Sequence, residues 1–333
     1  MMAALLWFAA SGAIIVLGGA MLTRAADVIA DRTGLGRVFV GTLLLATATS
    51  LPELTTDIAA VRLGEPNLAA GDLFGSSMAN MLILALINLL PPRGQVFRRA
   101  ASAHVLAGVL AIGLNALAAV FVLARPPYVI LGISPGSVLI VVVFLAGMRT
   151  VYNHSVGAGS PADSGTAPAG PHALSLNAAG LRFIVATVLI FVVAPRFAGA
   201  AKQVADLSGL GATFVGTWLV GAATSAPELV SCIAAVRLGA FDLAVGNLLG
   251  SNSFNMVVFL AMDVAHPGRT IFGAIDPSHA LSALVAVVLM CLALVAIVYR
   301  AERRFAFLES DSWVMLLTYL AGLWLLYQRT GAH

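Results

Sequence analysis

The sequence predicts an all-α polytopic membrane protein whose ten transmembrane helices form two inverted five-helix repeats. The prediction rests on the hydropathy of the chain, on an internal repeat, and on the odd number of helices in each half. The chain has 333 residues, of which 60% are hydrophobic and 10% are charged, with a mean hydropathy of +0.98. Soluble domains carry about 25% charged residues, so this composition excludes a soluble globular protein.

The charge distribution also argues against a nucleic-acid-binding protein. The formal net charge is only +3, and the arginines stand singly between apolar runs instead of gathering on one face. The two cysteines, Cys232 and Cys291, lie in apolar runs, so no disulfide framework or cysteine metal site is expected.

The ten helices are predicted from apolar windows, because a helix needs roughly 20 apolar residues to cross the hydrocarbon core. The first window, "MMAALLWFAASGAIIVLGG", lacks the basic start of a cleaved signal peptide and is interpreted as a retained helix. The windows lie near residues 3–30, 38–61, 67–90, 101–123, 129–148, 176–200, 213–236, 242–263, 279–299 and 312–328.

A stretch rich in Gly, Ser, Ala and Pro, from Asn153 to His172, separates the fifth window from the sixth. This composition is typical of a flexible linker. The expected organisation is therefore a first five-helix half over residues 1–150, a linker over 151–175, and a second five-helix half over 176–333.

The basic residues predict the orientation, because cytoplasmic loops carry an excess of Lys and Arg. Connections that follow odd-numbered windows hold 12 of the 18 basic residues. We therefore expect a multi-pass protein of the cell (inner) membrane, with the linker in the cytoplasm and both termini outside.

An internal repeat relates the two halves. Val40–Met81 aligns with Val215–Met256 at one constant offset, without a gap and with 25 of 42 positions identical. The identities include polar residues and prolines, which apolar helices do not share by chance. Because each half has five helices, the two copies enter the membrane in opposite senses. Folds with such inverted repeats place the substrate site near the bilayer midplane, usually on interrupted helices.

Each copy of the repeat carries a proline within its first helix, at Pro52 and Pro227. Proline has no backbone N–H and crowds the carbonyl four residues earlier, so Pro52 frees the carbonyl of Ala48 and predicts a kink at residues 46–49. Pro227 does the same to the carbonyl of Ala223. A freed carbonyl inside a membrane is tolerated only where it is buried in protein or lines a cavity.

A glutamate follows each proline, at Glu53 and Glu228. A charged side chain at the bilayer centre costs about 2.5–3.5 kcal/mol on insertion scales, which marks a functional position. Hydroxyl residues three and four positions earlier share the helix face of each glutamate. They are Thr49 and Ser50 in the first copy, and Thr224 and Ser225 in the second.

The next helix of each copy adds a serine and an asparagine four residues apart. These pairs are Ser76 with Asn80, and Ser251 with Asn255. Carboxylate, amide, hydroxyl and carbonyl oxygens without sulfur or imidazole are the ligands of Na⁺, Ca²⁺ or Mg²⁺. Kinks, hydroxyls bonded to their own helix and small-residue packing at Gly71, Gly75, Gly246 and Gly250 are the structural alternatives. The recurrence of the whole set in both halves favours a cation site.

These motifs resemble a known family. "TATSLPEL" and "AATSAPEL", each followed by "GD" or "GN" and by Gly-Ser and Asn, are similar to the two alpha repeats of sodium/calcium exchangers in the calcium:cation antiporter superfamily. The resemblance covers essentially the whole chain and implies exchange of Ca²⁺ for Na⁺ by alternating access.

The resemblance also implies roles for individual residues. Glu53 and Glu228 would bind Ca²⁺ and Na⁺ in turn, with the Thr49 and Thr224 carbonyls and the Ser50 and Ser225 hydroxyls. Ser76 and Ser251 would line outer Na⁺ sites together with the carbonyls of Ala46 and Gly221, while Asn80 and Asn255 would complete the middle of the site. The first and sixth helices would form the gating pair.

This chain departs from the family pattern at three positions. Prokaryotic sodium/calcium exchangers often carry Asp where this chain has Asn255, and Asn where it has Asp72. Asp57, one helical turn beyond Glu53, is a further acid. Either Asp57 and Asp72 belong to the ion path as accessory residues, or they sit at a wetted helix end near Arg62.

Three alternatives to Na⁺/Ca²⁺ antiport remain at the level of sequence. An H⁺/Ca²⁺ antiporter would protonate the glutamates, although the many hydroxyls favour Na⁺. A cation channel is a second alternative, and an intramembrane enzyme a third. The histidines are scattered and no His-Glu-x-x-His or Gly-x-Ser-x-Gly motif occurs, so no catalytic residues are expected. No cofactor and no obligate protein partner is expected besides the transported ions and the lipid bilayer.

Overall fold

The structure of the chain is a computed structural model. It describes residues 2–90, 96–97, 100, 103–130, 132–157, 174–207, 224–266, 270–299, 304–305 and 308–330. The elements of the first half are α1 (Met2–Thr33), α2 (Arg37–Phe39), the π-helix η1 (Val40–Leu45), α3 (Ala46–Thr49), α4 (Leu51–Arg62), α5 (Pro66–Asn88), α7 (His104–Ala124) and α8 (Pro135–Gly157).

The second half repeats this order of helices. Its elements are α9 (Leu176–Leu207), α11 (Ala226–Arg237), α12 (Phe241–Ala265), α13 (Ile271–Ala274), α14 (His279–Tyr299), the two-residue strands β1 (Arg304–Phe305) and β2 (Leu308–Glu309), and α15 (Ser310–Thr330). The strands pair antiparallel and join α14 to α15. The predicted all-α class is confirmed apart from this short hairpin.

Most of the described helices can cross a membrane. Seven are long and apolar enough, and the pair Arg37–Thr49 and Leu51–Arg62, bent by 43°, brings the number to as many as eight in the described part of the chain. α15 lies where the tenth helix was predicted. The first part of the predicted seventh helix, residues 213–223, lies outside the described residues, and α11 covers the rest.

The duplication extends beyond the aligned motifs to whole halves. α7 begins at His104 and α14 at His279, while α8 begins at Pro135 and α15 at Ser310. Both pairs of starting residues are related by the same offset as the sequence repeat. The same spacing therefore fixes where helices begin in segments whose side chains no longer match.

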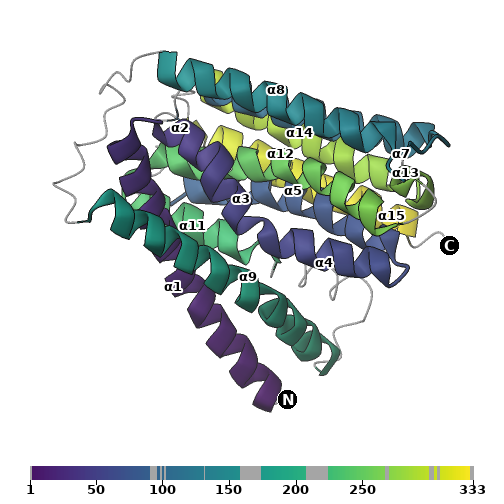
Figure 1. Ribbon diagram of the computed structural model, residues 1–333, viewed down its shortest axis with the longest axis horizontal. Coiled ribbons are helices and arrows are strands. Elements are labelled where there is room, and N and C mark those ends of the chain that lie inside the picture. Colours follow the sequence, from purple (N-terminus) through teal and green to yellow (C-terminus); the bar gives the residue numbers. More distant parts are fainter. Residues whose placement is uncertain are drawn as a thin grey trace.

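The two halves pack into each other instead of lying side by side as separate domains (Figure 1). α5 and α12 lie in the interior, and α12 contacts α4, α7 and η1 of the other half. α14 in turn packs against α7 and α5. α1 and α9 form a separate layer: they lie along each other at one side of the bundle, as Figure 1 shows at its lower left.

Hydrogen bonds at equivalent positions join the halves. The Asn88 amide at the end of α5 donates to the Ser312 hydroxyl of α15 over 3.1 Å. At the equivalent positions of the other repeat, the Ser137 hydroxyl of α8 donates to the Asp263 carboxylate of α12 over 2.7 Å. Each half thus forms a hydrogen bond with the fifth transmembrane helix of the other half.

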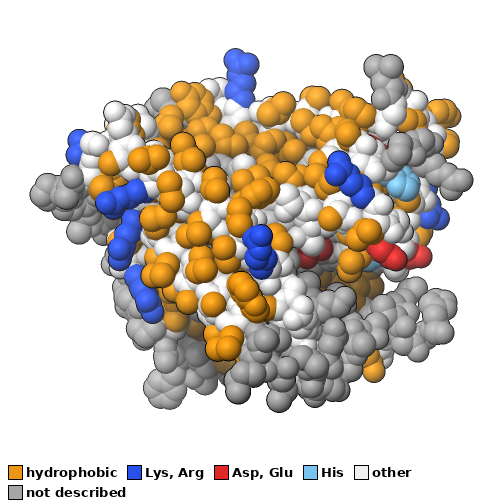
Figure 2. All heavy atoms as spheres, turned by 60° about the horizontal axis from the view of Figure 1, so that its bottom comes forward, with side chains coloured by type: hydrophobic (Ala, Val, Ile, Leu, Met, Phe, Trp, Pro, Cys, Tyr) orange, Lys and Arg blue, Asp and Glu red, His pale blue; other side chains and the backbone are white. Residues whose placement is uncertain are grey.

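The outer surface of the bundle is apolar. Leu17, Leu145, Ile184 and Val298 are each more than half exposed, and hydrophobic side chains spread over the face in Figure 2 with few charges among them. Such extended apolar surface does not occur on soluble monomers. It is the surface expected of helices that face lipid.

Two helical features differ from the sequence prediction. α8 continues to Gly157, past the predicted end at position 148, because hydropathy marks the membrane thickness and not the end of the helix. The first part of the predicted linker is therefore helical, and residues 158–173 lie outside the described residues. The π-helix η1 was also not predicted, and it adjoins the predicted site.

Candidate cation site

The predicted break in the first repeat helix lies at Ser50. Its backbone (φ −92°, ψ 5°) leaves the helical region between α3 and α4, and Pro52 occupies the first turn of α4. Ser225 has nearly the same backbone (φ −81°, ψ 6°) before α11, with Pro227 at the equivalent place. The predicted kink is confirmed for the first repeat, where the two helix segments meet at 43°.

Close backbone packing holds the first broken helix against α12. A Cβ atom on Gly250 would collide with the carbonyl oxygen of Thr42 in η1. On Gly246 it would lie 3.0 Å from the carbonyl oxygen of Val38. The absence of side chains at these two glycines lets η1 reach the α12 backbone, as the packing interpretation predicted. A π-helical turn is often found beside functional sites, and here it precedes the break.

The two glutamates lie in the protein interior close to each other. Glu53 and Glu228 are each 1% exposed, and their carboxylates are near enough to interact electrostatically. The Ser50 hydroxyl, three residues before Glu53, donates to Glu228 Oε1 over 3.2 Å. Glu53 Oε2 and Glu228 Oε2 have no hydrogen-bond partner. The two Pro-Glu motifs therefore meet across the repeat interface with unused carboxylate oxygens.

The other predicted side chains are buried as well, and most keep an oxygen without a partner. The partnerless atoms are the hydroxyl oxygens of Ser76, Ser225 and Ser251 and the amide oxygens of Asn80 and Asn255. Buried polar atoms in native proteins are nearly always hydrogen-bonded, and each exception asks for an explanation such as an ion. This group of oxygens belongs to hard-cation ligand types and contains no sulfur or imidazole.

Three of the predicted residues do not present a free, described oxygen to the site. The Thr49 hydroxyl lies 3.1 Å from Asn247 Oδ1 and also within reach of the Leu45 and Ala46 carbonyls. The Ala46 carbonyl accepts from the Ser50 amide over 3.0 Å, so it is already engaged in this structure. Gly221 lies outside the described residues.

A network of asparagines at the repeat interface was not singled out from the sequence. The Asn80 amide donates to Asn252 Oδ1 over 2.9 Å, and the Asn252 amide donates to the Ser77 carbonyl over 3.2 Å. The Asn115 amide donates to the Asn252 carbonyl. Asn252 and Ser77 are equivalent positions of the two repeats, so their contact lies near the axis that relates them. The sequence signal for Asn252 was that the aligned repeats differ at this position, where the first copy has Ser77.

The two accessory acids lie beside Glu53. Asp57 is fully buried, and its carboxylate interacts with Asp72 on α5. The Thr224 hydroxyl donates to Asp72 Oδ1 over 3.3 Å. The interpretation of a wetted helix end therefore does not fit Asp57, whereas Asp72 is partly exposed.

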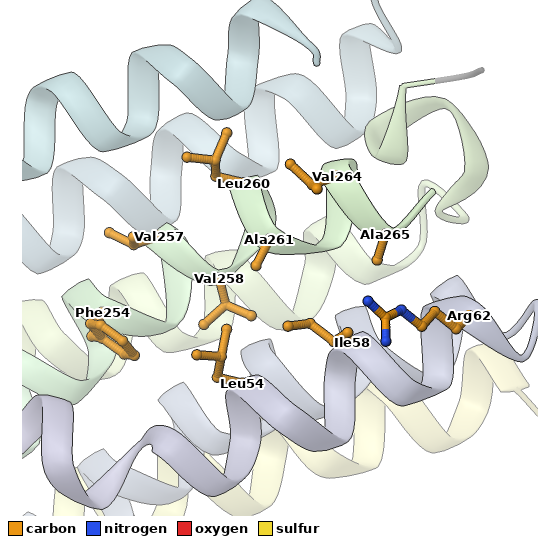
Figure 3. Close-up of a pocket in the computed structure, with 10 residues that line it drawn as sticks. All are labelled: Leu54, Ile58, Arg62, Phe254, Val257, Val258, Leu260, Ala261, Val264 and Ala265. Atoms are coloured by element: carbon orange, nitrogen blue, oxygen red, sulfur yellow. The ribbon is translucent and has the colours of Figure 1, made fainter. Parts of the chain in front are cut away.

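The groove between α4 and α12 is a different feature. It encloses about 420 Å³ and is lined by Leu54 and Ile58 of α4 facing apolar side chains of α12, with Arg62 at one end (Figure 3). None of the predicted oxygen ligands lines it. The candidate ion site is the polar interior around Glu53 and Glu228, on another face of α4.

Acids alone do not make a metal centre in this region. Among the described residues, no three His, Cys, Asp or Glu side chains converge to hold a metal ion. A cation between Glu53 and Glu228 would therefore need hydroxyl, amide and carbonyl oxygens to complete its shell. Such a mixed shell suits an ion that must also leave.

Comparison with known proteins places the chain in a family. The family model described as "Sodium/calcium exchanger protein" matches residues 3–148 and 179–328, which is most of the chain. The chain belongs to the sodium/calcium exchanger family. It is thus a membrane transporter of the calcium:cation antiporter kind, and the two matched segments coincide with the two halves of the exchanger.

Individual relatives agree with this assignment. The exchanger is 28% identical to the inner membrane protein YrbG of Escherichia coli over 274 residues, which cover 79% of each chain. It is 43% identical to the sodium/calcium exchanger MaX1 of Methanosarcina acetivorans over 58 residues, or 17% of each chain. The solved structure of the sodium-calcium exchanger NCX_Mj superposes with a TM-score of 0.72 at 19% identity, covering 96% of this chain and 97% of that one. That likeness confirms the predicted fold class.

Proposed function

We propose that this exchanger moves Ca²⁺ in one direction and Na⁺ in the other, at a site between Glu53 and Glu228. The observation that carries the proposal is the set of buried oxygens without hydrogen-bond partners around two facing glutamates. Two carboxylates neutralise one Ca²⁺, and the same oxygens can be shared among Na⁺ ions. Competition for one set of ligands couples the two fluxes.

The surrounding residues supply the remaining ligands of the proposed site. The Thr49 and Thr224 carbonyls would bind with the glutamates, and the Ser50 and Ser225 hydroxyls lie on the same helix turns. Ser76 and Ser251, with the Ala46 and Gly221 carbonyls, would hold Na⁺ away from the centre. Asn80 and Asn255 would close the middle, where Asn252 positions the Asn80 side chain.

The choice of Na⁺ over H⁺ as counter-ion rests on the ligand types. A proton binds to a single carboxylate oxygen, whereas Na⁺ needs several oxygens around it. Ser76, Ser225 and Ser251 keep buried hydroxyl oxygens without a partner, which an exchanger driven by protons alone would not need. The similarity to MaX1, whose name describes a sodium/calcium exchanger, supports the same choice.

Alternating access would come from the layer formed by α1 and α9. These two helices pack along each other outside the bundle that holds the site (Figure 1). Their contacts with each other pass through small residues, for example Gly18 against Ile190, which suits a sliding interface. We propose that this pair moves against the bundle, with both termini outside the cell and the 151–175 linker in the cytoplasm.

Ion uptake into proteoliposomes tests the proposed function. Vesicles loaded with Na⁺ and diluted into Na⁺-free buffer should accumulate ⁴⁵Ca²⁺, and loading with choline should abolish the uptake. A pH gradient without Na⁺ should drive none. Uptake that follows the pH gradient in the absence of Na⁺ would establish H⁺/Ca²⁺ antiport instead, and Ca²⁺ flux independent of either gradient would indicate a channel.

A further inference from the structure

The two halves of the site contain equivalent groups of three side chains with different chemistry. In one group the Thr49 hydroxyl donates to Asn247 Oδ1, and the Asn247 side-chain amide donates to the Cys232 sulfur over 3.6 Å. The residues at the equivalent positions of the other repeat are Thr224, Asp72 and Asp57. There the Thr224 hydroxyl donates to Asp72 Oδ1 over 3.3 Å, and Asp72 faces Asp57. The geometry is repeated, but two neutral groups have become two acids.

The neutral group is internally satisfied, and the acidic one is not. Cys232 also donates to the Ala244 carbonyl over 3.5 Å. In the acidic group, both oxygens of Asp57 and the Oδ2 atom of Asp72 are buried and accept no hydrogen bond from any other described residue, and the two carboxyl groups contact each other. Asp57 is 0% exposed. The acidic group thus has three buried acceptor oxygens without a donor from another described residue, and the equivalent group has none of this kind.

A further oxygen extends the acidic group along α5. Ser76 lies one helical turn after Asp72, so the two side chains share a helix face. The Ser76 hydroxyl oxygen is buried and has no partner. It provides a buried polar atom one helical turn from Asp72, independent of the two aspartates.

No basic side chain balances the two acids. Within the described residues, Asp57 interacts electrostatically with Asp72 and with Glu53, and no arginine, lysine or histidine forms an ion pair with either aspartate. A buried carboxylate is strongly unfavourable unless it is paired, binds a metal ion or takes up a proton, and counting the bound cations distinguishes the last two cases. Carboxylate and hydroxyl oxygens without sulfur or imidazole select a hard cation.

We propose that Asp57, Asp72 and the Thr224 hydroxyl form a second hard-cation subsite, one helical turn from Glu53, and that the equivalent group of Thr49, Asn247 and Cys232 forms no such subsite. The inference rests on the proposed function insofar as ions reach the subsite through the same interior. Na⁺ and Ca²⁺ share the required ligand chemistry, and the experiment distinguishes them. At saturation the exchanger would then bind one more cation than a variant of it that lacks the carboxyl groups of Asp57 and Asp72.

The second half of the protein supplies a matched variant for the test. Asp57→Cys combined with Asp72→Asn converts the acidic group into the composition that the fold already accommodates at Cys232 and Asn247. Glu65→Gln, at an exposed position before α5, is a control for loss of a surface charge. If the double variant does not fold, Asp57→Asn and Asp72→Asn replace it singly.

The measurement is the number of ions bound by the purified full-length protein at saturation, by equilibrium dialysis with ⁴⁵Ca²⁺ and separately with ²²Na⁺. We expect the double variant to lose one bound cation per protein in one of these series, while Glu65→Gln loses none. Glu53→Gln should remove a different bound ion. When Glu53→Gln is combined with the double variant, the two losses should therefore add. Equal stoichiometry of both ions in the wild type and the double variant would overturn the subsite. If Na⁺-driven uptake fails in the wild type but the loss of one ion is observed, the subsite stands and the proposed exchange does not.

Discussion

The two Pro-Glu motifs occupy equivalent positions, and their surroundings are alike at the glutamates but differ one helical turn further on. Glu53 and Glu228 are buried to the same extent, and Ser50 and Ser225, three residues before them, have similar backbone angles. One turn beyond the glutamates, the first half has Asp57 and the second has Cys232. The two repeats therefore keep the glutamates and the serines before them alike, and differ in charge one helical turn further on.

The largest predicted effect concerns what the halves share. Glu53→Gln and Glu228→Gln should each reduce Ca²⁺ exchange at least about 100-fold, because one lost charge leaves a single carboxylate facing a divalent ion; about 2.7 kcal/mol of lost stabilisation corresponds to this factor. Uptake of ⁴⁵Ca²⁺ by proteoliposomes measures the effect. Glu65→Gln, which removes an exposed acid, should transport normally.

The two glutamate variants should lose Ca²⁺ exchange to the same extent, because both carboxylates face the same ion. If one variant transports at the wild-type rate while the other is inactive, the site is not shared between the halves. Both variants should elute as monodisperse protein on size-exclusion chromatography, which separates loss of ion binding from loss of fold.

The sequence predicted the architecture well, because it follows from hydropathy and from the constant spacing of the repeat. The offset that relates Glu53 to Glu228 also relates the starts of α7 and α14. The glutamates, serines and asparagines of both repeats were predicted as one site, and those that the structure describes are buried in its interior.

The remaining features depend on contacts between the halves, which local sequence does not record. The π-helix η1 forms where Gly41 meets the backbone of Leu243. The role of Asn252 arises because it meets its own equivalent, Ser77, across the repeat axis. The burial of Asp57 could not be chosen over a wetted helix end, because the sequence alone does not show what covers that face of α4.

An intermediate effect is predicted for Asn252 and its equivalent Ser77, which make different hydrogen bonds. Asn252→Ala should lower stability by about 1–3 kcal/mol, because the Asn80 amide loses its acceptor inside the protein. Ser77→Ala should be mild, since the Ser77 hydroxyl donates only to the carbonyl of Leu73 in its own helix and Asn252 contacts the Ser77 backbone. Thermal unfolding of the two detergent-solubilised variants compares them.

An equal loss of stability in both variants would contradict the assignment of Asn252 to the repeat axis. Asn252→Asp keeps an acceptor for Asn80 but buries a carboxylate and sets it against the Ser77 carbonyl oxygen, so it should be destabilised at least as much as Asn252→Ala.

The smallest predicted effect concerns the serines that flank the centre of the site. Ser76→Ala and Ser251→Ala each remove one neutral oxygen ligand, which is worth about 0.5–1.5 kcal/mol for a typical polar interaction. We expect the Na⁺ concentration for half-maximal exchange to rise by roughly 2- to 10-fold, with little change in that for Ca²⁺. Ion titrations of exchange in proteoliposomes measure both, and a larger effect on Ca²⁺ than on Na⁺ would remove these serines from the Na⁺ positions. If the second cation subsite binds Na⁺, Ser76→Ala should have the larger effect of the two.

Anomalous X-ray scattering from crystals soaked in Sr²⁺, a heavier analogue of Ca²⁺, would locate the bound cation. We expect a peak between the carboxylates of Glu53 and Glu228, with both groups at about the 2.3–2.6 Å typical of Ca²⁺ ligands, slightly lengthened for the larger ion. The peak should weaken as Na⁺ replaces Sr²⁺ in the soak. A strong peak that contacts only one of the two glutamates, or that lies in the apolar groove between α4 and α12, would contradict a shared site at the repeat interface.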